Sequence, residues 1–321
     1  MAHKPVVVVG RKLPEAVEER LARDYQPRFN SNDKLYSSEE LLALCDGADA
    51  VLPCHSEHFT ADVIAKLPDS IKAIANFSVG VDHVDLAAAK TRGIIVTNTP
   101  NVLNDATAEI AILLMLGAAR RAHEGETIMR KGAWTTWSPE FMVGTQVTGK
   151  RFGVIGMGRV GQVAADRARG FGMEIHYYNR NRLDSEVENG AVYHDSIEDL
   201  LPHCDVLSLH CPATPETIKL LNAECIALLP NGAIVVNTAR GAIIDEDALL
   251  AALKSGKVAA AGLDVYAEEP ATQSTFKDQP NTFLLPHIGS ATHDTRDAMG
   301  FRALDNLDAI FAGKEPGDRV A

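Results

Sequence analysis

The chain has 321 residues, of which 46% are hydrophobic and 23% are charged, and these fractions are ordinary for a globular protein. They exclude a disordered chain, a collagen and a small disulfide scaffold, while the length suggests two domains. The formal net charge of −12 opposes binding to nucleic acid and to anionic membranes, so we expect neither as a partner.

The cysteines and the apolar runs bear on the cellular compartment. The apolar run Val6–Val9 is too short for the core of a signal peptide, and the stretch 110–119 is about half of a membrane span. An odd number of cysteines without a C-x-x-C pair argues against a disulfide framework and a zinc site, and for a reducing compartment. We therefore expect a cytoplasmic protein without a metal site. The five cysteines are Cys45, Cys54, Cys204, Cys211 and Cys225.

Short apolar runs alternate with helical patterns along the chain. Such uniformly apolar strands are typical of parallel sheets that helices cover on both faces. Two series of strands, with a long helix between them, predict an α/β fold with two doubly wound parallel-sheet domains. In chain order, we expect a strand at Val6–Val9, helices at Pro14–Asp24 and Ser38–Cys45, strands at Ala50–Leu52, Ile71–Phe77 and Gly93–Thr97, the long helix at Asn104–Arg121, strands at Arg151–Ile155, Glu174–Tyr178, Asp205–Leu209, Ala233–Asn237, Ala259–Leu263 and Thr282–Leu285, and a helix at Thr295–Phe311.

A glycine-rich loop follows the first strand of the second series. The segment Gly156–Gly161 has the pattern G-x-G-x-x-G and leads into the helical pattern Gln162–Arg169. The first glycine allows a tight turn, the second lets the backbone approach a pyrophosphate, and the third lets the helix pack on the strand. The N-terminus of the helix offers free N–H groups to the phosphates. The loop predicts a dinucleotide site, and an ordinary turn without a ligand is the alternative.

The next strand ends in a basic segment that bears on the choice of cofactor. NAD-binding versions of this loop carry an acidic residue about 20 residues further on, which binds the ribose 2′-hydroxyl. Here the sequence reads Asn179-Arg180-Asn181-Arg182, and the nearest acid is Asp184. Arg180 and Arg182 can bind a 2′-phosphate through charge-assisted hydrogen bonds. We expect NADP(H) to be preferred, with NAD(H) as the alternative cofactor.

Several further motifs occur along the whole chain: Asn76–Asp82, Asn98–Pro100, Thr107–Glu109, Asn237–Gly241, Gly262–Val265, Glu269-Pro270 and Pro286–Ser290. With the glycine loop, they resemble the D-isomer-specific 2-hydroxyacid dehydrogenases, most closely the glyoxylate/hydroxypyruvate reductase (glycerate dehydrogenase) branch. The resemblance implies a flavodoxin-like substrate domain, residues 1–99 and 288–321, and a Rossmann cofactor domain, residues 100–287, with the active-site cleft between them. It also implies hydride transfer from NADPH to a small 2-keto acid, such as glyoxylate or hydroxypyruvate, giving the D-2-hydroxy acid.

Such a reduction needs a cation for the keto acid and a proton donor for its carbonyl oxygen. Arg240 follows the strand Ala233–Asn237 at its carboxyl end, and a guanidinium is always charged and can bind a carboxylate with two hydrogen bonds. Histidine suits proton donation near neutral pH. We interpret His287 as the donor because it directly ends an apolar strand. The resemblance assigns Glu269, and not the adjacent Glu268, as the carboxylate that keeps this histidine protonated.

The resemblance also implies the remaining binding residues. Backbone N–H groups of Ser78, Val79 and Gly80 would bind the substrate carboxylate together with Arg240, and Phe141 would either form an apolar wall of the neighbouring subunit's site or lie in a dimer core. The cofactor-binding residues would be Thr107, Gly156, Met157, Gly158, Arg159, Val160, Asn179, Arg180, Asn181, Arg182, Cys211, Pro212, Thr217, Thr238, Ala239, Arg240, Asp264, His287 and Gly289.

The segment between the two strand series bears on assembly. Its apolar side chains Trp134, Trp137 and Phe141 predict a homodimer formed through the cofactor domain, because a monomer would expose them. An ordinary core between the domains is the alternative.

Two other functional interpretations remain. The chain could belong to another substrate class of the family, such as the phosphoglycerate, D-lactate or formate dehydrogenases. It could also be a dinucleotide sensor without catalysis, like the corepressors built on the same fold, because a fold does not determine a function. The complete set of Arg240, Glu269 and His287 argues against the sensor.

Overall fold

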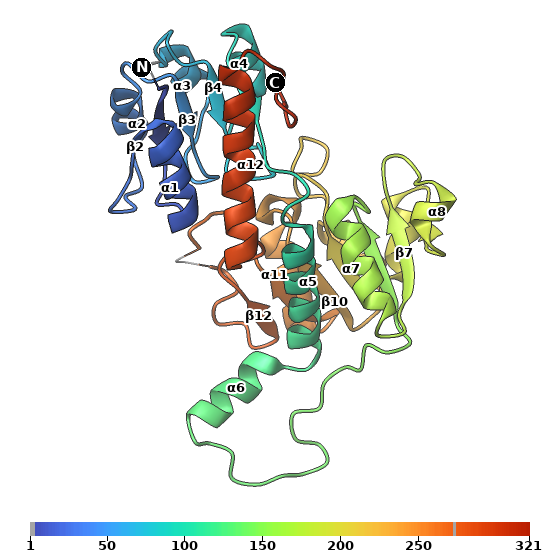
Figure 1. The fold of residues 1–321 in the computed structure, drawn as a ribbon. Coiled ribbons are helices and arrows are strands. Elements are labelled where there is room, and N and C mark those ends of the chain that lie inside the picture. Colours follow the sequence, from blue (N-terminus) through green and yellow to red (C-terminus); the bar gives the residue numbers. More distant parts are fainter. Residues whose placement is uncertain (1–3, 272–273) are drawn as a thin grey trace. The chain divides into compact units, whose positions relative to one another are not determined.

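The structure is a computed structural model that describes residues 4–271 and 274–321 (Figure 1). The chain divides into two compact units, one formed by the residues up to Leu103 together with Ala291–Ala321, the other by Asn104–Ser290. The boundaries expected from the sequence, after residues 99 and 287, lie a few residues earlier. The difference arises because helix α5 begins the second unit at Asn104, and because residues 288 and 289 are hydrogen-bonded to Asp264 of that unit.

The first unit is a five-stranded parallel sheet in the order β2-β1-β3-β4-β5, which is the flavodoxin-like order. Successive residues of each strand are buried against helices on opposite faces: Val7 and Val9 pack with α1 and α12, and Val8 packs with α2, α3 and α4. The elements are β1 (Val6–Val9), α1 (Glu15–Asp24), β2 (Gln26–Arg28), α2 (Ser38–Leu44), β3 (Ala50–Leu52), α3 (Ala61–Lys66), β4 (Ala73–Ala75), α4 (Leu86–Thr91), β5 (Ile95–Thr97) and α12 (His293–Phe311).

The second unit is a seven-stranded parallel sheet in the order β12-β11-β10-β9-β6-β7-β8. The direction of winding reverses at β6, and open α/β sheets bind ligands at the carboxyl ends of the strands on either side of such a point. Its elements are α5 (Asn104–Ala119), α6 (Ala122–Arg130), β6 (Arg151–Ile155), α7 (Arg159–Arg169), β7 (Glu174–Tyr178), α8 (Ser185–Glu188), β8 (Val192–Tyr193), α9 (Ile197–Leu200), η1 (Leu201–His203), β9 (Val206–Leu209), α10 (Ala223–Leu228), β10 (Ala233–Asn237), η2 (Gly241–Ile243), α11 (Glu246–Ser255), β11 (Val258–Leu263) and β12 (Thr282–Leu284).

The predicted fold class is confirmed. The observed elements differ from the predicted ones at two short strands and at the ends of two helices. Strands β2 and β8 were not expected, because β2 (Gln-Pro-Arg) contains no apolar residue that marks a buried strand and β8 has only two residues. The long helix ends at Ala119 and not at Arg121, since Arg121 adopts a left-handed conformation (φ 55°) and a separate helix, α6, follows it. The last helix begins two residues earlier than expected, at His293, where the Thr292 side chain accepts a hydrogen bond from Thr295 N.

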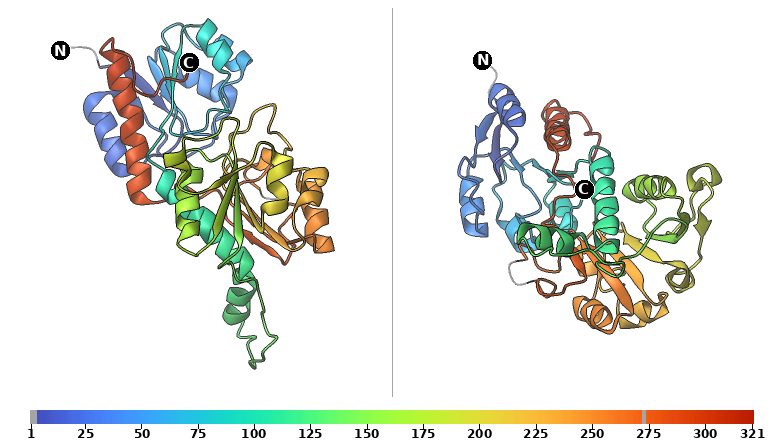
Figure 2. Two further views of the ribbon diagram at one scale, coloured as in Figure 1. Left: turned by 90° about the vertical axis from the view of Figure 1, so that its right-hand side faces the viewer. Right: turned by 90° about the horizontal axis from the view of Figure 1, so that it is seen from below.

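After α6 the chain runs without helix or strand to β6. Figures 1 and 2 show α6 and this green segment projecting away from the rest of the second unit. Large apolar side chains on it are exposed, among them Met129, Trp134, Trp137, Phe141 and Val143, and 71% of Trp137 is accessible. None of the helices in the described part of the chain combines the length and apolarity that a membrane span requires.

Candidate functional site

The glycine loop lies at the carboxyl end of β6 and opens helix α7. Gly156 has φ +93°, and a Cβ there would lie 2.5 Å from Cys211 N; a Cβ on Gly161 would lie 2.4 Å from Gly156 O. Both positions therefore need glycine for close packing. At Gly158, by contrast, a Cβ would meet no described atom within 4 Å. The space above Gly158 and the N–H groups that begin α7 at Arg159 and Val160 suit a phosphate group.

The turn after β7 holds this loop in place. The side chain of Asn179 accepts a hydrogen bond from Met157 N (2.7 Å), and Gly156 N donates to Tyr178 O (3.0 Å). Asn179, expected from the family to touch the cofactor, thus fixes the shape of the glycine loop through its side chain.

The two arginines of the turn after β7 differ in their contacts, a difference that the sequence alone does not reveal. Arg182 binds Glu188 with two hydrogen bonds (2.7 and 3.1 Å) and stacks on the ring of Tyr193. Hydrogen bonds from Arg182 and from Tyr177 lower the pKa of the Glu188 carboxyl. Arg180 is exposed. The pKa of the nearby Glu216 is lowered mainly by a hydrogen bond with the Thr214 side chain, and the charge of Arg180 adds a smaller effect. The expectation that both guanidinium groups bind a 2′-phosphate stays a prediction; the structure shows that Arg182 is also engaged with Glu188. Asn181, between them, is exposed.

Arg240 lies directly after β10, in extended conformation, at the start of the turn η2. Asn237, the buried last residue of β10, shapes this turn: its amide donates to Arg240 O (2.9 Å) and its side-chain oxygen accepts from Ala239 N (2.9 Å). A Cβ on Gly241 would lie 1.8 Å from the carbonyl carbon of Tyr266, so only glycine lets the two chain segments approach. Gly241 thereby packs the Arg240 turn against the segment that leads to Glu269.

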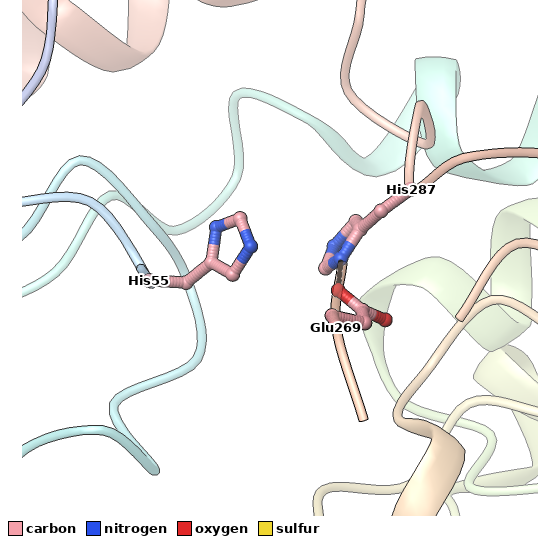
Figure 3. A group of neighbouring side chains, drawn as sticks. All are labelled: His55, Glu269 and His287. Atoms are coloured by element: carbon pink, nitrogen blue, oxygen red, sulfur yellow. Dashed lines mark hydrogen bonds and ion pairs between the residues drawn. The ribbon is translucent and has the colours of Figure 1, made fainter. Parts of the chain in front are cut away.

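Glu269 and His287 form a pair within the second unit (Figure 3). The Nδ1 atom of His287 lies 2.6 Å from one carboxylate oxygen of Glu269, and the other oxygen accepts a hydrogen bond from Tyr266 N (2.9 Å). Both side chains are partly accessible, at 29% and 23%. Because Nδ1 faces the carboxylate, the opposite ring atom Nε2 is the one that can give a proton to a ligand.

Asp264 holds the chain at this histidine and at the two residues that follow it. Its carboxylate, 1% exposed, accepts hydrogen bonds from Ile288 N and Gly289 N (2.8 Å each), and its carbonyl accepts from His287 N (2.8 Å). Burial raises the pKa of Asp264, while these backbone hydrogen bonds oppose the rise. His287 has φ 53°, a left-handed conformation that costs energy for a residue with a Cβ. Asp264, expected to contact the cofactor, is thus the residue that fixes this loop.

The other expected cofactor residues surround the same edge of the sheet. Thr107 is buried in the first turn of α5, within 3.5 Å of a Cβ placed on Gly289. Thr217 closes its own loop by donating to Pro212 O and accepting from Thr214 N (2.7 Å each). Cys211 is partly buried, and burial raises the pKa of its thiol to about 11. All five cysteines lie in the described part of the chain and are free.

One polar group of this region was missed by the sequence analysis. His210, directly after β9, lies 2.8 Å from the hydroxyl of Ser208 and 3.4 Å from that of Thr238. Burial lowers the pKa of His210 to about 4, so this histidine is neutral at neutral pH and connects two strand ends. His210 could have been identified from the sequence because it directly follows the predicted strand Asp205–Leu209.

The expected substrate loop Ser78–Gly80 lies in the first unit, after β4. The hydroxyl of Ser78 donates to Gly80 O (2.6 Å), and Asn98 donates to Val79 O (2.9 Å). Asn76, which precedes the loop, is fully buried: its side-chain oxygen accepts a hydrogen bond from His83 Nε2 (2.8 Å), and its amide nitrogen donates to Thr97 O (2.9 Å). These bonds fix the loop's backbone.

Comparison with known proteins agrees with this arrangement. Residues 112–289 match the model of the "D-isomer specific 2-hydroxyacid dehydrogenase, NAD binding domain". The glycerate dehydrogenase of Hyphomicrobium methylovorum is 42% identical over 314 residues, which cover 97% of this chain and 98% of that protein. The glyoxylate reductase of Thermococcus litoralis is 39% identical over 322 residues, covering 99% and 97%. A crystal structure of the NADPH-dependent glyoxylate/hydroxypyruvate reductase of Sinorhizobium meliloti with NADP and malonate superposes with a TM-score of 0.88 at 32% identity, covering 99% and 97%.

Proposed function

Because the chain belongs to the family of D-isomer-specific 2-hydroxyacid dehydrogenases, an NAD(P)-dependent family that acts on small keto and hydroxy acids, we propose that it reduces glyoxylate and hydroxypyruvate with NADPH. The observation that carries the proposal is the pair of Glu269 and His287 on the same unit as the glycine loop and Arg240. A dinucleotide sensor without catalysis would not need a histidine proton donor whose Nδ1 atom is held by a carboxylate.

The glycine loop Gly156–Gly161 would hold the nicotinamide cofactor, which would supply the hydride for the carbonyl carbon of the keto acid. Arg240 binds the carboxylate of the keto acid and polarises its carbonyl group. His287 gives the proton on Nε2 to the carbonyl oxygen, and Glu269, bound at Nδ1, stabilises the charged imidazole before the transfer and fixes the ring. Backbone N–H groups of the loop Ser78–Gly80 are the proposed further ligands of the carboxylate.

The substrate assignment is tested by kcat/KM values for a panel of 2-keto acids. We expect glyoxylate and hydroxypyruvate to exceed pyruvate and bulkier 2-keto acids, with D-glycerate as the product from hydroxypyruvate. A preference for a bulkier acid, or for formate in the reverse direction, would assign the chain to another substrate class of the family.

Preference for NADPH is supported by the turn after β7. Its acidic position is taken by Asn179, which contacts the loop, and Arg180 is exposed beside it. A carboxylate here would repel a 2′-phosphate, whereas an arginine can bind one with charge-assisted hydrogen bonds.

We therefore expect Arg180→Ala to raise the Kd of NADPH about 10-fold or more and to change that of NADH much less, since a lost hydrogen bond to a charged group corresponds to about 1.5–3 kcal/mol. Arg182→Ala is the matched control, because its guanidinium is bound to Glu188, and we expect it to reduce thermal stability more than cofactor selectivity. Equal Kd values of the wild type for NADPH and NADH would contradict the assignment.

A homodimer is the proposed assembly. The projecting segment from Met129 to Val143 exposes several large apolar side chains. Where it rejoins the unit, a hollow of about 460 Å³ is lined by residues of five segments, including Ala118, Val143, Ala260 and Asn281. Exposed apolar groups beside a hollow of this kind are typical of a protein interface, and a second copy of the chain brings the same groups.

Sedimentation at micromolar concentration should show a species of twice the 34.5 kDa of one chain. Trp137→Arg should shift the equilibrium toward the monomer, because a charge buried in an interface without a partner is costly. A wild type that sediments only as the single chain would rule out the dimer.

A further inference from the structure

Three histidines that the proposed reaction does not use lie together on the second unit. His176 is in β7, His194 follows β8, and His203 ends η1. The Nδ1 atom of His176 and the Nε2 atom of His194 are 2.9 Å apart. The ring of His203 is nearly parallel to that of His176, with centroids 5.3 Å apart, and lies 5.0 Å from that of His194. We call these three residues the histidine cluster.

The contact between His176 and His194 requires that at least one of the two rings is neutral. A hydrogen bond between two imidazoles needs one nitrogen as donor and one as acceptor, so at most one of the two rings can be charged. If both were protonated, two N–H groups would face each other at 2.9 Å. His176 is 5% exposed, so water cannot readily separate the charges.

The charged groups around the cluster compensate only part of an added charge. Glu174 of β7 lies 3.3 Å from His176 Nε2, an atom with no hydrogen-bond partner among the described residues. Asp195 and Asp199 favour a charge on His194, whereas Arg151 of β6, itself bound by Asp205, opposes one on His176. Burial, the largest cause, and the neighbouring histidines lower the pKa of His176 and of His194.

The cluster sits where the edge of the sheet is attached by few bonds. Strand β8 pairs with β7 at two positions only, opposite His176 and Tyr177. Another side-chain link of this edge is the buried Glu188, which binds Arg182 and Tyr177. These bonds lower the pKa of Glu188, so acid does not readily break them. Strand β7 itself continues into Tyr178 and Asn179, which hold the glycine loop.

We propose that the histidine cluster is an acid-sensitive contact that stabilises the cofactor unit: protonation of both His176 and His194 separates their rings, loosens the β8–α9 edge and weakens cofactor binding. Since neutral rings are favoured in the folded state, their stabilisation is fully present above the ordinary histidine pKa of about 6.5 and is lost as the pH falls below it. Cofactor binding by this unit is a property of the family, so the inference does not depend on the preference for NADPH.

The test compares the Kd of NADPH between about pH 7.5 and 5.5 for the wild type and for His194→Gln/His203→Gln. Glutamine keeps a polar group opposite His176 but cannot be charged. In the wild type, one linked proton should raise the Kd up to about tenfold per pH unit beyond the change in the double variant. Titration of the 2′-phosphate contributes equally to both proteins and cancels in the comparison.

Two controls complete the design. His293→Gln removes an exposed histidine of the other unit and should behave as the wild type. Amide hydrogen exchange of residues 192–203, corrected for the intrinsic effect of pH, should accelerate at low pH in the wild type but not in the double variant; this readout is independent of the cofactor.

If the double variant does not fold, His203→Gln alone, at an exposed position, should show a smaller effect in the same direction. Equal pH dependence of Kd and of exchange in the wild type and in the folded variant would overturn the proposal.

Discussion

Replacing His287 with alanine should lower kcat by about 10²–10⁴-fold, which is the usual contribution of a positioned proton donor. The structure gives the reason: Nδ1 lies 2.6 Å from Glu269, Asp264 fixes the backbone at His287 and after it, and Nε2 is the ring nitrogen that the proposed reaction uses. The Kd of NADPH should change much less than kcat, because the loop Gly156–Gly161, the proposed phosphate site, belongs to another part of the same sheet edge. Steady-state rates together with NADPH fluorescence titrations provide both numbers.

Glu269→Gln tests the role of the carboxylate charge beside the proton donor His287. The amide can keep the contact with the ring, but it lacks the charge that favours the imidazolium. The pH above which the rate declines should therefore move to lower pH, while the rate at low pH stays closer to that of the wild type. A near-normal rate of His287→Ala at every pH, or an unchanged pH profile of Glu269→Gln, would refute the assigned roles.

Arg240→Ala should lower kcat/KM by about 10²–10³-fold, since it removes an oriented charge that acts on the developing negative charge of the carbonyl oxygen. Arg240→Lys keeps the charge but loses the planar fork, so we expect it to recover only part of the activity. Asn237 and Gly241, which shape the turn, are not changed by either substitution. If Arg240→Ala retained the kcat/KM of the wild type for glyoxylate and hydroxypyruvate, the keto acid would have to be bound elsewhere.

The sequence predicts the large elements of the fold because their signal is collective. Strands such as Val6–Val9 and Ala233–Asn237 are uninterrupted apolar runs, and the structure places them in parallel sheets with the same bounds. Strand β8, by contrast, consists of Val192 and Tyr193, and its pairing with β7 depends on distant residues that no local pattern reveals.

At the candidate site, too, local sequence patterns are predictive, whereas contacts between distant residues are not. The glycine pattern predicts a tight turn before a helix, and Gly156 and Gly161 show the close contacts that such a turn requires. The two arginines after β7 could not be distinguished, because the carboxylate that binds Arg182 comes from Glu188, whose burial depends on the folding of α8 against β7. His210 meets the criterion used for His287, a histidine at the end of an apolar strand, but lies against Ser208 and Thr238.

The most direct test of the central claim is the absorbance of reduced nicotinamide in a solution of the purified protein, NADPH and glyoxylate or hydroxypyruvate. We predict a steady fall with the wild type, at least about 10²-fold slower with His287→Ala at equal NADPH occupancy. A wild type that binds NADPH, yet leaves its absorbance unchanged with every 2-keto acid of the panel, would contradict the account and identify the chain as a dinucleotide-binding protein without this catalysis.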